Sequence, residues 1–249
     1  MTPRCLARAA ALAIAFAFAA CAWAQAPAPK TTRILFIGNS LTYTLETPER
    51  VERLAKAMGR DAKVESVAFG DYSLVDHWAD GRALAAIKKG PWDIVVLQQG
   101  ASADPQSREE LAKSVKQFAG PIRDAGAKPA LFMAWPSSDR SKDFGGAIGS
   151  YRAAAEANDA ILLPVGEAWL RALSKDKRLK LYGDTIHQSS LGSDLAVLTI
   201  YLVLFPAGPQ EFTEEFVAKA AKALDMQAAT RDAFFDAATL AIDEPMVLK

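Results

Sequence analysis

Cysteine and histidine are scarce in this chain, and their scarcity excludes several kinds of chemistry. There are two cysteines and two histidines in 249 residues. Two histidines cannot form a three-histidine zinc site, and no cluster of cysteines and histidines replaces it. Both cysteines, Cys5 and Cys21, lie within the first 26 residues, so a chain cleaved there has no disulfide and no thiol chemistry. We therefore expect no metal site.

Signatures of nucleotide and nucleic-acid binding are missing as well. The chain has no Gly-x-x-x-x-Gly-Lys-Ser/Thr phosphate loop and no Gly-x-Gly-x-x-Gly after a strand, so we expect no cofactor. It also lacks the Gly-x-Ser-x-Gly nucleophile elbow. Basic and acidic residues number 29 each, and loss of Arg4 and Arg8 with a leader would leave 27 against 29. Such a balance gives no electrostatic footprint for nucleic acid.

The N-terminus has the pattern of an export signal. Arg4 and Arg8 precede an apolar run over residues 9–20, and small residues suited to cleavage follow, up to Ala26. The apolar run is too short for a membrane span. This pattern predicts a bacterial-type signal peptide over residues 1–26 and an exported protein, periplasmic or secreted.

Two further expectations concern the same end of the chain. Residues 27–31 begin with a proline- and alanine-rich stretch and precede the first predicted strand. We expect this segment to be a flexible lead-in. Residues 18–21, Phe-Ala-Ala-Cys, form a loose lipobox, so a lipid anchor on Cys21 is the alternative to simple cleavage. The oligomeric state is left open.

Residues 32–249 alternate short apolar runs with longer amphipathic stretches. The short runs predict five strands, at 34–37, 64–69, 93–97, 129–134 and 160–165. The longer stretches predict helices, at 47–58, 77–89, 108–125, 144–158, 167–173 and 191–205, with a helical C-terminal tail over 211–240. Strands separated by such helices form a parallel sheet through right-handed crossovers. We expect a single α/β domain, a three-layer α/β/α sandwich around a five-stranded parallel sheet.

Ser40 stands where such a fold places its chemistry. The apolar run over residues 34–37 ends at Gly38, and Ser40 follows two residues later. In open α/β sheets, ligands bind in the crevice outside the carboxyl ends of the strands. Ser40 is therefore a candidate nucleophile, and the alternative is that it only caps a turn.

Activation of Ser40 requires a base, and His187 is the better placed of the two histidines. A serine hydroxyl becomes a nucleophile when an adjacent group accepts its proton. His187 follows the fifth predicted strand and precedes the apolar helix, with Asp184 three residues before it. One tight turn would set the Asp184 carboxylate against the imidazole. The alternative for this pair is a solvated acid beside a half-buried histidine.

Four other residues have simpler interpretations. His77, at the start of the predicted helix over 77–89, is interpreted as capping and packing material at the border of the pocket. Trp135, after the fourth predicted strand, either lines the substrate cleft or packs at an interface. Glu167 and Asp159 are expected to be solvated charges.

Two blocks of this chain resemble those of the SGNH (GDSL-type) hydrolases. Residues 37–42 read Ile-Gly-Asn-Ser-Leu-Thr and residues 95–98 read Val-Val-Leu-Gln, as in a narrower branch of that family. The resemblance covers nearly the whole chain after the leader, and it implies a flavodoxin-like SGNH hydrolase fold.

The resemblance also implies roles for individual residues. Ser40 matches the nucleophile, and its own backbone N–H is one oxyanion donor. Gly70 matches the glycine whose backbone N–H is a second donor. Asp184 and His187 match the Asp-x-x-His block, as orienter and general base.

The third family block departs from the pattern. The wider family has Gly-x-Asn-Asp, whose asparagine amide is the third oxyanion donor, whereas residues 97–104 read Leu-Gln-Gln-Gly-Ala-Ser-Ala-Asp. By resemblance to the narrower branch, Gln98 is the matching residue, because a glutamine amide can donate as asparagine does. Gln99 and Ser102 are the alternatives, and Ser102 falls at the asparagine position in register by Gly100.

These expectations together imply ester hydrolysis by two-step acyl transfer, without cofactor or metal. Family analogy favours short-chain, acetyl-type esters, with carbohydrate as one carrier of the acyl group. The alternatives are a long-chain acyl hydrolase, such as a thioesterase or lysophospholipase, and a non-catalytic binding module on the same fold. The expected partner is a small-molecule or carbohydrate ester, with no nucleic acid and no membrane span.

Overall fold

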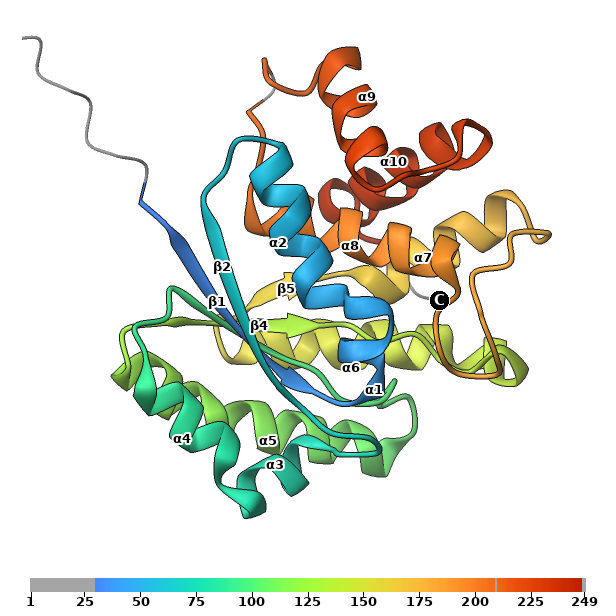
Figure 1. The fold of residues 1–249 in the computed structure, drawn as a ribbon. Helices are drawn as coiled ribbons and strands as arrows, with labels where there is room; N and C mark the ends of the chain where they lie inside the picture. Colours follow the sequence, from blue (N-terminus) through green and yellow to red (C-terminus); the bar gives the residue numbers. More distant parts are fainter. Residues whose placement is uncertain (1–29, 209, 248–249) are drawn as a thin grey trace, which may run out of the picture.

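A computed structural model describes residues 30–208 and 210–247, and a five-stranded parallel sheet lies at its centre (Figure 1). The strands are β1 Thr32–Gly38, β2 Ala62–Ala68, β3 Ile94–Leu97, β4 Lys128–Phe132 and β5 Ile161–Leu163. Their order is β2-β1-β3-β4-β5, and every neighbouring pair is parallel. This confirms the predicted α/β fold, and the strand order is the flavodoxin-like one.

The order reverses on either side of β1, which pairs with β2 on one edge and with β3 on the other. In doubly wound sheets of this order, such a switch point is where the ligand crevice opens.

The predicted signal peptide over residues 1–26, its Cys21 alternative and residues 27–29 of the predicted lead-in lie outside the described residues.

Helices cover both faces of the sheet and make the outer two layers (Figure 1). One face carries α3 Leu74–Asp80, α4 Arg82–Lys89, α5 Pro105–Asp124 and α6 Phe144–Ala157. The other carries α2 Thr47–Ala57 and α8 Ser190–Leu204, against which α7 Val165–Lys175, α9 Glu214–Ala223 and α10 Ala228–Asp243 pack. Three short helices complete the chain: α1 Ser40–Tyr43, η1 Thr44–Glu46 and η2 Ser138–Asp143.

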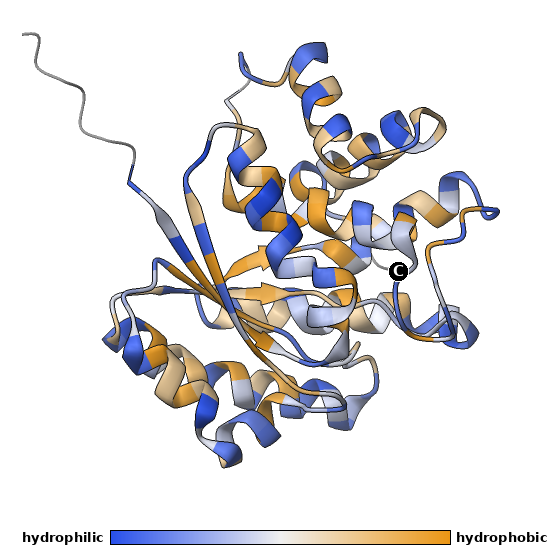
Figure 2. Ribbon diagram, viewed as in Figure 1, coloured by the Kyte–Doolittle hydropathy of each residue, from blue (hydrophilic) through white to orange (hydrophobic). Residues whose placement is uncertain are grey.

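The central strands are apolar because both of their faces are covered. The four residues Ile34–Ile37 of β1 and all four residues of β3 are buried. Figure 2 shows this as hydrophobic colour along the strands, while hydrophilic colour marks the outer sides of the helices. The apolar run that predicts the first strand therefore predicts the centre of the core as well.

Two predicted helices are each divided in the structure. The helix expected over 77–89 is α3 and α4, which meet at Gly81 with φ of +80°, a conformation that favours glycine. Its first turn begins earlier than expected, because Ser73 and Asp76 form a capping box. The tail expected over 211–240 is likewise two helices, α9 and α10, joined by a turn in which Asp225 has φ of +53°.

The expectation that Glu167 is solvated is wrong, whereas Asp159 is exposed as expected. Glu167, in the first turn of α7, has an exposure of 0%. Its carboxylate pairs with Arg152 and with Arg171, whose Nη2 lies 3.0 Å from Oε1. Oε1 also accepts the backbone N–H of Met246 at 2.8 Å. Glu167 therefore ties the C-terminal segment to α6 and α7.

In the part of the chain that the structure describes, no helix combines the length and the apolar character needed to cross a membrane.

Replacement of Glu167 by glutamine is expected to lower the free energy of unfolding by about 3–5 kcal/mol, because two largely buried guanidinium groups would lose their counter-charge. Denaturant unfolding of Glu167→Gln beside Asp159→Asn measures this effect. The Asp159 variant removes an exposed carboxylate and should change stability by no more than about 0.5 kcal/mol. Equal midpoints for the two variants would contradict the structural role of Glu167.

Candidate active site

Ser40 is the first residue of α1, immediately beyond the turn at the end of β1. Asn39 caps this helix, because its Oδ1 accepts the backbone N–H of Leu41 at 3.1 Å. The other side of the same amide is used too, since Nδ2 donates to the carbonyl of Tyr72 at 3.1 Å. An aspartate at this position would lack that second hydrogen bond. The turn that carries Ser40 is therefore held to the segment after β2.

Gly38 allows the chain to turn this sharply. A Cβ on Gly38 would lie 2.3 Å from Oγ1 of Thr42 and 2.4 Å from Oε1 of Gln98, closer than atoms approach without moving. The requirement is one of space, because the side chains that support the turn pack directly on its backbone.

His187 and Asp184 form a hydrogen-bonded row with Ser40. His187 Nε2 lies 2.9 Å from Ser40 Oγ, and His187 Nδ1 lies 2.8 Å from Asp184 Oδ2. With the imidazole protonated at Nδ1, it donates to the carboxylate and accepts the serine hydroxyl at Nε2. The structure thus brings together three residues from the start of α1 and from the loop before α8. Ser40 and His187, which are in contact, lie 147 positions apart along the chain.

The Asp184 carboxylate is held ionised by its own loop. Its Oδ1 accepts the backbone N–H groups of His187 and Ile186, each at 2.7 Å. These bonds, the one from His187 first, together with the imidazole at Oδ2, lower the pKa of Asp184 to about 2. Asp184 is therefore an anion at neutral pH, and its carboxylate orients the ring.

The loop that carries His187 is anchored on two sides. Gln188, which is 3% exposed, donates from Nε2 to the Thr44 carbonyl at 2.7 Å. Trp135 donates from Nε1 to the Ile186 carbonyl at 2.9 Å and stacks on Trp169 with 3.9 Å between ring centroids. Sequence reasoning did not single out Gln188, and its position beside His187 was the only available signal.

Trp135 borders the pocket described below, in keeping with the first of its two predicted roles. Its ring is 2% exposed and stacks on Trp169, so it packs inside the domain.

Two backbone N–H groups remain unbonded beside the turn. Within the described part of the chain, neither the N–H of Ser40 nor that of Gly70 donates to a protein acceptor. Gly70 lies two residues beyond Ala68, which pairs with Gly38 across the sheet. Both groups therefore stand at the same edge of the sheet, where the resemblance assigns oxyanion donors to them.

The contacts of Gln98 conflict with its predicted role as an oxyanion donor. Gln98 is 1% exposed, and its Oε1 accepts the N–H of Asn39 at 2.9 Å and the hydroxyl of Thr42 at 2.7 Å. Its Nε2 donates to the carbonyl of Gln99 at 2.6 Å. Because a backbone N–H can only donate, the amide oxygen must face the turn, and the side chain supports the turn instead of reaching a substrate.

The two alternative donors are engaged as well. The Gln99 amide donates from Nε2 to Oγ of Ser102 at 2.8 Å and accepts the N–H of Leu74 at Oε1 at 3.2 Å. The Ser102 hydroxyl lies 3.2 Å from the Gly100 carbonyl. The side chains of Gln98, Gln99 and Ser102 are thus engaged within the protein, and the backbone N–H groups of Ser40 and Gly70 are the candidate donors without a protein acceptor among the described residues.

His77 lies in α3 and does not cap it, because Ser73 does. It is fully buried and packs against the rings of Phe69 and Tyr72, so the packing interpretation holds. Its Nε2 donates to the carbonyl of Gly38 at 2.8 Å. Burial lowers the pKa of His77, although the Gly38 carbonyl, Asp80 and Asp76 act in the opposite direction. The ring is therefore a neutral donor.

A pocket of about 300 Å³ opens beside the Ser40–His187 contact. Leu41 and Ile186, the neighbours of Ser40 and His187, form part of its wall. Its other walls mix apolar and polar groups, and among them are Trp135, Asp104, Ser107, Arg140 and Asp143. Such a space can enclose a small molecule and offers it both apolar and polar contacts.

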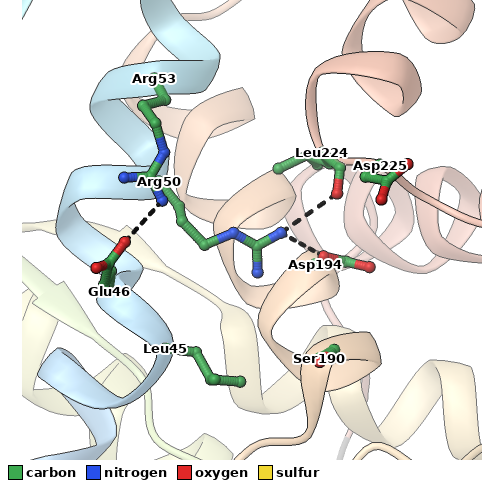
Figure 3. Close-up of a pocket in the computed structure, with 8 residues that line it drawn as sticks. All are labelled: Leu45, Glu46, Arg50, Arg53, Ser190, Asp194, Leu224 and Asp225. Carbon is green, nitrogen blue, oxygen red and sulfur yellow. Dashed lines mark hydrogen bonds and ion pairs between the residues drawn. The ribbon is translucent and has the colours of Figure 1, made fainter.

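A larger cleft of about 500 Å³ lies on the α2 side and does not contain the row (Figure 3). Figure 3 shows Arg50 crossing it from α2 to Asp194 of α8 and to the Leu224 carbonyl. Arg50 also donates to Ser193 Oγ at 2.6 Å. Ser190 borders this cleft, but both imidazoles are engaged elsewhere, on Gly38 and Ser40. The cleft is thus a structural junction of α2, α8 and α9.

Replacement of Gly38 by alanine is expected to displace the turn and to lower the free energy of unfolding by about 1–3 kcal/mol through overpacking. The reaction of Ser40 with a fluorophosphonate should slow by about 10²-fold, since misplacement of a reacting group by about 1 Å costs that much. Gly145→Ala is the control, because nothing lies within 4 Å of its added Cβ in α6 and no proline follows it, and it should stabilise the helix. Unchanged reactivity in Gly38→Ala would contradict this account of the turn.

Comparison with protein-family models and with curated proteins found no match. Among solved structures, a candidate SGNH hydrolase from Slackia heliotrinireducens is 28% identical, with a TM-score of 0.58 over 70% of this chain and 100% of that chain. A DUF4886 family protein from Bacteroides uniformis is 17% identical, with a TM-score of 0.67 over 88% of this chain and 97% of that chain.

A mutant of an acetyl-xylooligosaccharide esterase from Geobacillus Stearmophilus is 14% identical, with a TM-score of 0.55 over 72% of this chain and 95% of that chain. At these lower identities, the second and third structures show the fold alone. The first shares sequence as well as fold, and with the predicted fold confirmed, these structures support the predicted resemblance of the chain to the SGNH (GDSL-type) hydrolases.

Proposed function

We propose that this protein is a serine esterase that removes short, acetyl-type acyl groups through an acyl-enzyme. The observation that carries the proposal is the hydrogen-bonded row from Ser40 Oγ through His187 to Asp184, with both contacts below 3 Å. A nucleophile within hydrogen-bond reach of a base, with the base oriented by a third group, is the arrangement that acyl transfer requires.

The proposed reaction has two steps. Ser40 Oγ attacks the ester carbonyl while His187 Nε2 accepts its proton, and the N–H groups of Ser40 and Gly70 stabilise the oxyanion. His187 then protonates the leaving alcohol as the tetrahedral intermediate collapses to the acyl-enzyme. Water, deprotonated by the same imidazole, repeats the sequence and releases the acid. Asp184 keeps the ring in the required tautomer throughout.

The proposed substrate is a short acyl ester of a polar alcohol, and carbohydrate is one such carrier. A pocket of about 300 Å³ with Asp104, Ser107 and Arg140 on its walls can bind hydroxyl groups next to a small acyl group. The acetyl-xylooligosaccharide esterase among the structural neighbours supports the same class by analogy. We include export in the proposal, by the signal peptide over residues 1–26 or as a lipoprotein through Cys21.

A long-chain acyl hydrolase is the second candidate, because apolar side chains lie exposed around the row. Tyr43, Leu45 and Ile186 are 45%, 43% and 49% exposed, and all three are within five residues of Ser40 or His187. They could hold an acyl chain that extends beyond the pocket. A non-catalytic binding module on this fold is the remaining alternative.

Covalent labelling of the protein with a fluorophosphonate, together with p-nitrophenyl acetate turnover, tests the mechanism. Labelling should disappear in Ser40→Ala, and kcat should fall by about 10⁴- to 10⁶-fold in Ser40→Ala and His187→Ala. Asp184→Asn should lower kcat by about 10⁴-fold, because the imidazole would adopt the wrong tautomer. Ser174→Ala, an exposed serine in α7, is the control that should keep both signals. A folded protein without labelling or turnover would favour the binding module.

A series of p-nitrophenyl esters from acetate to palmitate separates the two hydrolase candidates. We expect kcat/KM to be highest for acetate or butyrate and to fall by about tenfold or more at chains longer than eight carbons, since the pocket cannot enclose them. A maximum at long chains, reduced by Ile186→Ser, would establish the long-chain alternative and reject the short-chain proposal.

A further inference from the structure

Two buried side chains from different elements meet the same peptide bond, the one between Gly38 and Asn39. His77 Nε2 donates to its carbonyl oxygen at 2.8 Å, and Gln98 Oε1 accepts its N–H at 2.9 Å. The two side chains are 0% and 1% exposed. The carbonyl also accepts the backbone N–H of Phe69 at 3.1 Å. The peptide bond ends at Asn39, so both of its polar ends are fixed one residue ahead of the nucleophile.

The direction of each bond follows from chemistry. A carbonyl can only accept, so Nε2 of His77 carries the proton, and a backbone N–H can only donate, so Gln98 presents its oxygen. Gln98 is itself held by the Thr42 hydroxyl and by the Gln99 carbonyl. His77 packs against the rings of Phe69 and Tyr72, which also contact each other. Neither side chain can turn away without leaving a buried polar group unpaired.

The second nitrogen of His77 adds to this constraint. Its Nδ1 is buried and has no hydrogen-bond partner within the described residues. A doubly protonated ring would therefore place an unpaired N–H in the interior, and burial already disfavours the charged form. The charged side chains that act on it, Asp76, Asp80 and Arg82, do not approach Nδ1 within hydrogen-bond distance. The geometry keeps His77 a one-proton donor to Gly38.

We propose that His77 and Gln98 are positioning residues that clamp the Gly38–Asn39 peptide from its two ends and thereby fix the Ser40 hydroxyl and N–H for reaction. This inference rests on the proposed esterase function. His77 comes from α3, beyond β2, and Gln98 follows β3, so the clamp joins the two strands that flank β1. Neither residue would touch the substrate.

The test uses two His77 variants whose side chains have similar polarity but different length, one Gln98 variant and one control. His77→Gln can place an amide N–H near the position of Nε2, whereas His77→Asn is one methylene too short. Gln98→Met keeps the length and removes all three side-chain hydrogen bonds of Gln98. Ile122→Ala, a buried change in α5, is the control for a general loss of stability. Each variant is measured for melting temperature, for kcat and KM on p-nitrophenyl acetate, and for the rate of fluorophosphonate labelling.

In His77→Asn and Gln98→Met, we expect kcat and the labelling rate to fall by about tenfold or more per folded molecule, with KM within about threefold. His77→Gln should recover most of the wild-type rate. The double variant should lose less than the product of the single losses, because both side chains act on one peptide. Ile122→Ala should melt earlier while its folded molecules react at the wild-type rate.

Wild-type kcat in His77→Asn or in Gln98→Met, or equal losses in His77→Asn and His77→Gln, would overturn the clamp. If Gln98→Met does not fold, the two His77 variants decide by themselves. Hydrogen exchange of the Asn39 amide provides a readout that needs no activity. Faster exchange in Gln98→Met supports the clamp and unchanged exchange rejects it, even if the wild-type protein proves inert and the esterase proposal fails.

Discussion

The geometry of the candidate site depends on how β1 ends. Hydrogen bonds to the neighbouring strands fix the backbone of a central parallel strand up to its last paired residue. In β1 this residue is Gly38, which pairs with Ala68 of β2. The next peptide bond lies beyond that pair: its carbonyl still accepts the backbone N–H of Phe69 at 3.1 Å, whereas its N–H has no backbone partner. Gln98 accepts that N–H, and His77 adds a second hydrogen bond to the carbonyl. Ser40 inherits its position from this arrangement, and His187, anchored separately through Trp135 and Gln188, meets it at 2.9 Å.

Much of the fold and the hydrogen-bonded row could be predicted from sequence because the signals are local. A continuous apolar run marks a strand that is covered on both faces, and the residue types of Ser40, Asp184 and His187 are those that acyl transfer uses. Parallel strands bring their carboxyl ends to one edge of a sheet whatever the length of the connections. No long-range packing detail is needed to expect these three side chains together, although their function stays a proposal.

The parts that could not be predicted depend on partners far along the chain. The prediction that Glu167 is solvated is wrong because its burial follows from Met246, 79 positions away, from Arg152 of α6 and from Arg171 on the next turn of α7. The Gln98 amide could either donate to an oxyanion or support the turn. The Asn39 N–H, which needs an acceptor, determines that the amide oxygen faces the turn. The sequence pattern predicts that a helix starts at His77. In the structure, the cap at Ser73 begins the helix earlier, and the turn at Gly81 divides it.

In the proposed mechanism, the departure in the third block changes which groups stabilise the oxyanion. The resemblance to the wider family implies an asparagine side chain as a donor, whereas here the polar side chain after β3 accepts the Asn39 N–H. The proposed oxyanion is then left with backbone donors, and the direction of a backbone N–H depends on its peptide plane. The N–H of Ser40 belongs to the plane that follows the clamped one, so a rotation at Gly38–Asn39 would carry it out of line. Preorganised donors stabilise developing charge only if they cannot turn, and in this chain the buried pair His77 and Gln98 meets that condition.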